Sequence, residues 1–232
     1  MTTTIRRLRP SLVGTAPGVR YERELWSAGR DMVVGVDEVG RGAWAGPLTV
    51  GAVVIPHDKR IYKIRDSKQL TENEREAIVD RIKEWAVAWS VGHVSAAECD
   101  VIGMSNAQQL GAQRAIDGLQ VEVSHALVDG PWDFIGTLDT TTIIRGDRIS
   151  LSIAAASIVA KVTRDRMMRE ASEHYPWYSL DSNKGYPCPK HRAALSLLGP
   201  STLHRRSWSF MEKLPWSGVE GCNTATNPLT LF

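Results

Sequence analysis

Short apolar and β-branched runs, bounded by turn residues, predict strands along much of the chain. Residues 32–36 and 48–55 form two such runs on either side of a glycine-rich segment, and Pro56 ends the second. Three further runs are typical of strands, at residues 89–94, 123–128 and 141–144. The pattern therefore predicts five strands, with the first two as neighbours.

Polar residues at capping distance mark where helices begin. A Ser or Thr followed three residues later by Glu or Gln occurs at Thr71 with Glu74, Ser95 with Glu98, and Ser105 with Gln108. The first of these helices is expected to end near residue 88. Residues 150–174 predict a long helix, whose three alanines at 154–156 allow close packing. Shorter helices are expected at residues 190–198 and 203–212.

The length and composition favour one principal domain. The chain has 232 residues, of which 43% are hydrophobic, and can bury one good core. Residues 1–28 lack apolar periodicity and contain prolines and glycines, which predicts a loosely ordered extension. We expect the folded domain at residues 29–213, with a helical part at about 174–213, and a flexible tail at 214–232.

Charge and cysteine content narrow the class of protein. The formal charge of +2 is only mildly basic and identifies no partner by itself. From Lys161 to Lys213, however, ten Lys or Arg stand against five Asp or Glu, with aromatic residues among them, so this region could follow a phosphate backbone. The three cysteines form no C-x-x-C pair, and no apolar run has the length of a membrane span. We expect a soluble, cytoplasmic protein with no membrane partner, and a monomer by default.

Two predicted strands end in acids that are followed by glycine. The segment GVDEVGRG at residues 35–42 runs from an apolar strand into Asp37 and Glu38, and ALVDG at residues 126–130 repeats the pattern with Asp129. A buried carboxylate without a partner costs on the order of several kcal/mol, so a lysine, an arginine or Mg²⁺ is expected beside Asp37. For this segment alone, an acid that merely faces solvent is an equally good interpretation.

Parallel neighbouring strands would bring these acids together. Glu38 would point to the opposite face from Asp37 unless the strand ends or bulges there. Asp147 lies just before the predicted long helix, where an acid can also serve simply as a helix-entry residue. Acids that meet from separate strands match two-metal phosphodiester hydrolysis, which uses about four carboxylates around ions roughly 3.5–4 Å apart.

Taken in order, the motifs of this chain resemble those of the ribonuclease HII family. They are GVDEVGRGAWAGPL at residues 35–48, DSKQLT at 66–71, VDG at 128–130, GD at 146–147, SIAAASIVAKVTRDR at 152–166, NKGYPCPKH at 183–191 and GPSTLHRRSW at 199–208. The full ordered set, over about residues 31–212, is far more specific than DEVGRG alone. The resemblance implies an α/β fold of the ribonuclease H type, with a central mixed five-stranded sheet flanked by helices and a small helical C-terminal part that binds substrate.

The resemblance also implies an activity. Members of the family hydrolyse the phosphodiester 5′ of a ribonucleotide in RNA/DNA hybrid or in duplex DNA with embedded ribonucleotides, and leave 3′-hydroxyl and 5′-phosphate ends. This implies roles in ribonucleotide excision repair and RNA primer removal. Two Mg²⁺ or Mn²⁺ ions would be held by the acidic set Asp37, Glu38, Asp129 and Asp147. Asp165 is a rival for the fourth place in this acidic set. We set it aside because it lies far along the predicted long helix, where Lys161 offers it a surface partner.

For substrate selection, the resemblance implies that Gly40, Arg41 and Gly42 read the ribonucleotide 2′-hydroxyl and that Tyr186 stacks on the neighbouring deoxyribose. An ordinary core aromatic is the alternative for Tyr186. Candidates for contact with the nucleic-acid backbone are Ser67, Lys68, Lys161, Lys184 and Arg205. A solvated surface role is at least as good an interpretation for most of these.

The last five residues, PLTLF, resemble the short L-x-L-F peptides that bind the sliding clamp, with Leu229, Leu231 and Phe232 as contacts. The usual leading glutamine is absent, and a chance apolar terminus is the competing interpretation. Two other functions stay open: another ribonuclease H-like DNA repair nuclease, and a non-cleaving nucleic-acid-binding module. The glycine turn with Tyr186 argues against the first, and the presence of all four acids argues against the second.

Overall fold

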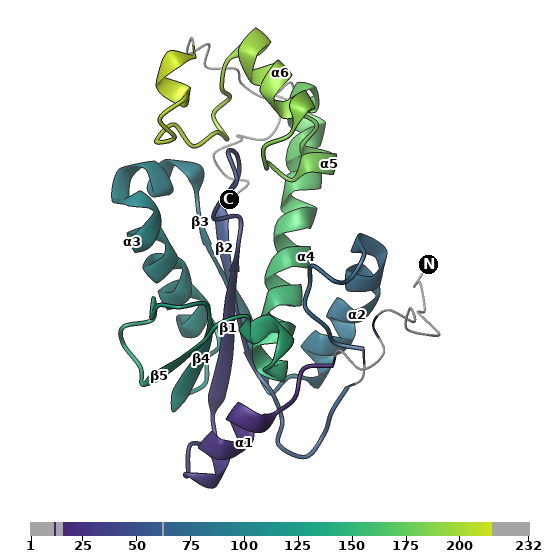
Figure 1. Ribbon diagram of the computed structural model, residues 1–232, viewed down its shortest axis with the longest axis vertical. Coiled ribbons are helices and arrows are strands. Elements are labelled where there is room, and N and C mark those ends of the chain that lie inside the picture. Colours follow the sequence, from purple (N-terminus) through teal and green to yellow (C-terminus); the bar gives the residue numbers. More distant parts are fainter. Residues whose placement is uncertain (1–11, 13–15, 62, 215–232) are drawn as a thin grey trace. The chain divides into compact units, whose positions relative to one another are not determined.

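The computed structural model describes residue 12 and residues 16–61 and 63–214, and its central element is a five-stranded sheet with the order β3-β2-β1-β4-β5 (Figure 1). The strands are β1 Val33–Val39, β2 Leu48–Val54, β3 Ala88–Val94, β4 His125–Asp129 and β5 Thr140–Ile143. Strand β4 pairs in parallel with both β1 and β5. The five predicted strands and the α/β class are confirmed.

Among the described helices, one precedes the first strand, two lie between strands, and the remaining three follow the last strand. They are α1 Arg20–Ser27, α2 Glu72–Trp85, α3 Ala96–Asp117, α4 Leu151–His174, α5 Leu180–Asn183 and α6 Pro189–Leu198. Short 3-10 turns are η2 Gly146–Arg148, η3 Pro176–Tyr178 and η4 Met211–Lys213. No helix in the described part of the chain has the length and apolar character needed to cross a membrane.

The chain divides into two compact units. The first comprises Met1–Val39, Val50–Gly92 and Gln109–Val162, and the second comprises Gly40–Thr49, His93–Gln108 and Thr163–Phe232. Each unit has its own apolar core. The second unit extends beyond the helical part that we expected at residues 174–213, because it also takes in the glycine-rich segment that follows β1.

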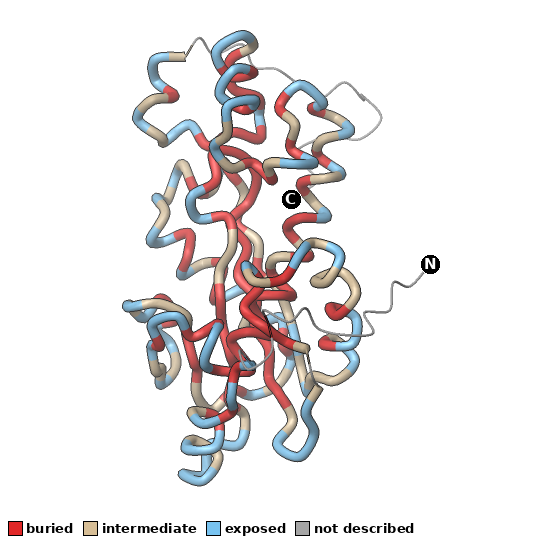
Figure 2. Tube along the Cα trace, turned by 45° about the vertical axis from the view of Figure 1, so that its right-hand side comes forward, coloured by how far each residue is buried: buried red, intermediate tan, exposed pale blue. Residues whose placement is uncertain are grey.

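Small residues let α4 lie directly against the sheet of the first unit. A Cβ atom at Gly35 of β1 would lie 2.2 Å from the backbone carbon of Ser152, and one at Gly51 of β2 would lie 2.5 Å from the carbonyl oxygen of Ala156. The predicted close packing around residues 154–156 is confirmed. Burial is continuous from Val33 to Asp37 in β1 and over residues 151–160 of α4 (Figure 2). The first acid of the site therefore stands at the end of a fully packed strand.

The predicted loosely ordered extension is wrong for residues 20–27, which form α1. Glu22 of this helix is fully buried, and its carboxylate accepts hydrogen bonds from Ser150 and Ser152 at the start of α4. These partners lie far away in sequence, so no local pattern announces them. Residues 1–11, 13–15 and 215–232 lie outside the described residues, and so does the predicted contact of Leu229, Leu231 and Phe232.

The separate helix predicted from the pattern at Ser105 is confirmed, because α3 consists of two helices joined by a kink at Gly103, whose backbone angles are non-helical. Another helix prediction needs correction. Residues 203–212 form turns rather than a helix, apart from the short η4. The backbone N–H of Arg205 donates to the carbonyl of Trp44 at 2.8 Å, so tertiary hydrogen bonding replaces the helical pattern there.

Candidate functional site

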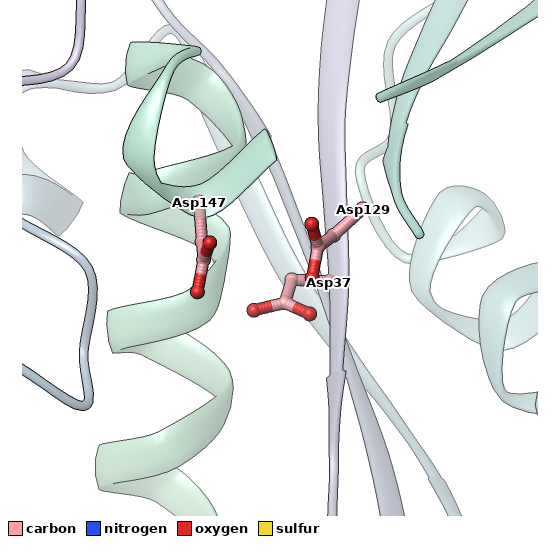
Figure 3. Close-up of side chains that lie close together, drawn as sticks. All are labelled: Asp37, Asp129 and Asp147. Carbon is pink, nitrogen blue, oxygen red and sulfur yellow. The ribbon is translucent and has the colours of Figure 1, made fainter. Parts of the chain in front are cut away.

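Three acids from separate elements meet in the first unit. Asp37 lies in β1, Asp129 at the end of β4 and Asp147 in η2, and one carboxylate oxygen of each lies within 4.8 Å of the others (Figure 3). The cause is the parallel register, in which Val36 is opposite Val128, so that the following residue of each strand is an aspartate. The expected parallel pairing that brings Asp37 and Asp129 together is confirmed.

The fourth predicted acid, Glu38, is not part of this group of three. Strand β1 continues through Glu38 to Val39. Glu38 is half-buried, and its charge still acts on Asp37.

Burial dominates the electrostatics of Asp37. It raises the pKa of this carboxyl well above its ordinary value, and the charges of Glu38 and Asp129 raise it further. A hydrogen bond from Ser157 and the charge of Lys68 oppose the rise. Like charges gathered in a buried place need a cation to be ionised together.

Lys68 supplies a positive charge to Asp147, with Nζ 3.2 Å from Oδ2. Burial raises the pKa of Asp147, Lys68 opposes this rise, and Asp129 and Asp66 add to it. Asp66, itself buried, accepts the backbone N–H of Lys68 at 2.8 Å and pairs with Nε of Arg148 at 3.1 Å. In the segment 66–68, the Lys68 side chain thus contacts Asp147 of the acidic group, and the Asp66 side chain contacts Arg148, the next residue.

Two serines connect the same segment to α4. Oγ of Ser67 lies 2.8 Å from Oγ of Ser157, and Ser157 also hydrogen-bonds Asp37. Sequence reasoning did not find Ser157, because nothing distinguishes it from the small residues around it that pack against the sheet. Its position fixes the orientation of the Asp37 carboxylate.

Gly146 holds the loop that carries the third acid. Its N–H donates to Oδ1 of Asp129 at 2.6 Å. A Cβ atom at this position would lie 2.6 Å from Cδ1 of Ile153, so a larger residue would require that side chain to shift. The hydrogen bond from Gly146 is what connects the loop to Asp129.

The donor set fits a divalent cation. Three carboxylate oxygens lie within 4.8 Å of one another, and the side chains of Asp37 and Asp147 belong to residues only 4% and 3% exposed. Mg²⁺ and Mn²⁺ prefer hard carboxylate oxygens. A cation bound there would offset the repulsion that raises the pKa of Asp37.

A second group of predicted residues lies in the second unit. The glycine turn, Gly40 to Gly42, begins with Gly40 at φ 89°, whose N–H donates to Oη of Tyr186 at 3.0 Å. Arg41 and Gly42 are exposed. A Cβ atom at Gly42 would meet no atom within 4 Å. The glycine turn is thus hydrogen-bonded to Tyr186 through Gly40, while Arg41 and Gly42 are exposed to solvent.

The remaining candidates differ in where their side chains point. Lys161 is half-buried on α4, whereas the Lys184 ammonium is turned inward and donates to the carbonyl of Asp181. Arg205 is fully buried, and its guanidinium donates to the carbonyl oxygens of Arg41 and Gly46.

Asp165, which we expected on the surface, is only 2% exposed and is not in the group of three acids. The surface location that we used to set Asp165 aside is therefore wrong. A further buried residue, Arg164, was not found from the sequence, since an arginine in a helix is usually a solvated residue.

Comparisons with known proteins agree with this geometry. The sequence model of the family described as Ribonuclease HII matches residues 34–211. A ribonuclease HII of Streptomyces avermitilis is 40% identical over 201 residues, which are 86% of each chain. The solved ribonuclease H2 of Pyrococcus horikoshii OT3 is 28% identical with a TM-score of 0.66 and covers 78% of this chain and 95% of its own. The RNase HII of Archaeoglobus fulgidus, solved in complex with PCNA, is 26% identical with a TM-score of 0.65 and covers 76% and 95%.

Proposed function

The chain belongs to the ribonuclease HII family and is a ribonuclease H endonuclease, and from this premise we propose that it hydrolyses the phosphodiester on the 5′ side of a ribonucleotide. The substrates are RNA/DNA hybrid and duplex DNA with embedded ribonucleotides, and the products carry 3′-hydroxyl and 5′-phosphate ends. Such an activity serves ribonucleotide excision repair and the removal of RNA primers.

The observation that carries this proposal is the meeting of Asp37, Asp129 and Asp147 within 4.8 Å. In the proposal, these carboxylates hold two divalent ions, Mg²⁺ or Mn²⁺, and Glu38 assists from the same strand. Bound divalent cations would activate the attacking water and stabilise the leaving 3′ oxygen. The aspartates supply the negative charge that retains the cations beside the phosphate.

Neighbouring residues orient this acidic set. Ser157 holds the Asp37 carboxylate, and the N–H of Gly146 holds that of Asp129. Lys68, whose side chain is 74% exposed, is free to turn toward a phosphate of the substrate while its backbone stays on Asp66. We assign Lys68 and Lys161 to contacts with the nucleic-acid backbone.

Recognition of the ribonucleotide is assigned to the glycine turn and Tyr186. The fold itself requires glycine at position 40, because the backbone φ there is 89°. It does not require glycine at position 42, since a side chain there would enter open space and the φ of Gly42 lies outside the left-handed region. A glycine that the fold itself does not require supports close approach of a ligand, here the 2′-hydroxyl side of the sugar.

Three labelled duplexes test the proposal: one with a single ribonucleotide, one entirely of DNA and one RNA/DNA hybrid. With Mg²⁺ or Mn²⁺ we expect cuts in the first at the 5′ side of the ribonucleotide and in the hybrid, and none in the all-DNA duplex. Equal cutting of the all-DNA duplex would instead identify a DNA repair nuclease. Binding without any cutting would identify a non-cleaving module.

Two variants sharpen this test. Asp129→Asn should abolish cleavage and keep most of the binding, because phosphate contacts dominate affinity; Asp117→Asn, an exposed acid on α3, is the matched control. Gly42→Ala should leave the melting temperature unchanged and weaken binding of the ribonucleotide-containing duplex. Full activity of Asp129→Asn would show that these acids do not take part in the cleavage reaction.

The C-terminal residues Leu229, Leu231 and Phe232 are assigned to a sliding clamp. Their L-x-L-F pattern supports this, and so does the similar RNase HII of Archaeoglobus fulgidus, which was solved in complex with PCNA. A peptide of residues 224–232 should bind a bacterial clamp, and the same peptide with alanine at 231 and 232 should not. Equal binding of the two peptides would show that Leu231 and Phe232 are not the residues that contact the clamp.

A further inference from the structure

Arg164 of α4 is a fully buried arginine, and each of its three side-chain nitrogens donates to a backbone carbonyl. Nε donates to the carbonyl of Pro47 at 2.8 Å, Nη1 to that of Lys184 at 2.8 Å, and Nη2 to that of Ala45 at 3.0 Å. The first and third carbonyls belong to the segment that follows the glycine turn, and the second precedes Tyr186 by two residues. One side chain therefore joins two stretches of chain, around Ala45 to Pro47 and at Lys184.

The same guanidinium contacts both proposed recognition elements. A Cβ atom at Gly40 would lie 2.3 Å from Nε of Arg164, so the turn rests directly on this side chain. The guanidinium also lies 5.4 Å from the ring centre of Tyr186, within the range of a cation–π interaction. Gly40 and Tyr186, which hydrogen-bond each other, thus share one buried cation as their support.

A second buried arginine holds the other side of the turn. Arg205 is also fully buried, and it donates to the carbonyl of Arg41 at 3.0 Å and twice to the carbonyl of Gly46, at 3.0 and 3.2 Å. The oxygen of Arg41 lies between the two glycines of the turn. With Arg164, this side chain binds the segment from Arg41 to Pro47 at four separate carbonyls.

The chemistry of the guanidinium suits this task. Burial lowers the pKa of Arg164 to about 10, so this guanidinium stays charged at neutral pH, and burial also lowers the pKa of Arg205. A planar fork with several fixed N–H donors can bind carbonyls that point in different directions, whereas a lysine offers one compact ammonium. Such donors hold a loop that contains glycines, which would otherwise sample many conformations.

We infer that Arg164 and Arg205 are positioning residues that shape the glycine turn and Tyr186 and thereby set the selectivity for a ribonucleotide. The inference rests on the proposed function of these two elements. It replaces the expectation that Arg205 contacts the nucleic-acid backbone, because its donors are used on Arg41 and Gly46. Neither arginine touches the substrate in this account.

The test measures selectivity in the Asp129→Asn background, where the substrate stays intact. The ratio of dissociation constants for an all-DNA duplex and a duplex with one ribonucleotide is compared between this protein and the same protein with Arg164→Lys. We expect the ratio to fall roughly tenfold, since a small displacement of a recognition group has large effects. Arg166→Lys, an exposed arginine of the same helix, is the matched control and should keep the ratio.

A control distinguishes positioning from misfolding. Mn²⁺ binding to the acids is measured for each arginine variant in the otherwise wild-type protein. The acids lie in the other unit, so their affinity for Mn²⁺ should not change. Should Arg164→Lys fail to fold, Arg205→Lys is measured in the same way and carries the same expectation. An unchanged ratio in a folded variant overturns the inference. If the parent protein shows no preference for the ribonucleotide, the proposed function fails instead.

Discussion

The Lys68 ammonium lies 3.2 Å from a carboxylate oxygen of Asp147, although 79 residues separate them in sequence. The Lys68 side chain is 74% exposed and that of Asp147 is 4% exposed, so a solvent-facing cation meets a buried anion. The Lys68 ammonium thus pairs with a carboxylate that a bound divalent cation would also use as a ligand. The pair therefore makes competition between the ammonium and the metal testable.

Lys68→Met should increase the affinity for Mn²⁺ at neutral pH. Removal of one positive charge next to Asp147 lowers the repulsion on a second cation, and solvent screening limits the gain to about two- to fivefold. Titration calorimetry checks this, with Lys190→Met, an exposed lysine of α6, as the control. Weaker binding in Lys68→Met would mean that the lysine orders Asp147 rather than competing with the metal.

Glu22→Ala should destabilise the protein by about 3 kcal/mol, because three buried donors lose their acceptor. Oε1 of Glu22 accepts the hydroxyl of Ser150 at 2.6 Å and the N–H and hydroxyl of Ser152 at 2.9 and 2.8 Å. Urea denaturation measures the loss. Glu24→Ala, an exposed residue of the same helix that pairs with Arg20, should cost less than about 0.5 kcal/mol. Equal, small losses in both variants would show that α1 is not part of the folded unit.

Stability should fall at acid pH through His204. Burial, together with neighbouring His191, lowers the pKa of His204 to about 3. Its Nδ1 accepts the N–H of Ser201 at 3.0 Å, so the proton is on Nε2, which donates to His191 at 2.9 Å. Unfolded histidine titrates near pH 6.5, so between about pH 6.5 and 3 only the unfolded chain takes up the proton.

The size of this effect follows from the same linkage. From pH 7 to pH 5 the wild type should lose about 2 kcal/mol more free energy of unfolding than His204→Gln, which lacks the titrating ring. Chemical denaturation at the two pH values gives the difference. Parallel losses in wild type and variant would show that His204 is protonated in the folded protein.

The acidic group was largely predictable from sequence. An apolar run that ends in an aspartate and a glycine occurs at Asp37 and again at Asp129, and parallel pairing of β1 with β4 brings the two ends together. That Glu38 lies outside the group within 4.8 Å was not predictable, because it depends on the local geometry of the strand end rather than on the residue types.

The supports of the site were mostly beyond sequence reasoning. Arg164 and Arg205 bind carbonyl oxygens, which every residue has, so no side-chain pattern marks their partners. Glu22 lies in a segment that looked structureless because its partners lie 128 and 130 residues away. Local patterns predict elements and acids at their ends, whereas long-range contacts with backbone groups appear only in the folded chain.

Mn²⁺ binding to Asp37→Asn shows directly whether the three aspartates hold a divalent cation. The substitution removes one carboxylate whose pKa is raised by burial, so the fold should not suffer from it. Free Mn²⁺ is measured by electron paramagnetic resonance during titration of wild type, Asp37→Asn and the exposed control Asp117→Asn. We predict that wild type and control bind alike and that Asp37→Asn binds at least roughly tenfold more weakly. Equal Mn²⁺ affinity of Asp37→Asn and wild type would contradict this prediction.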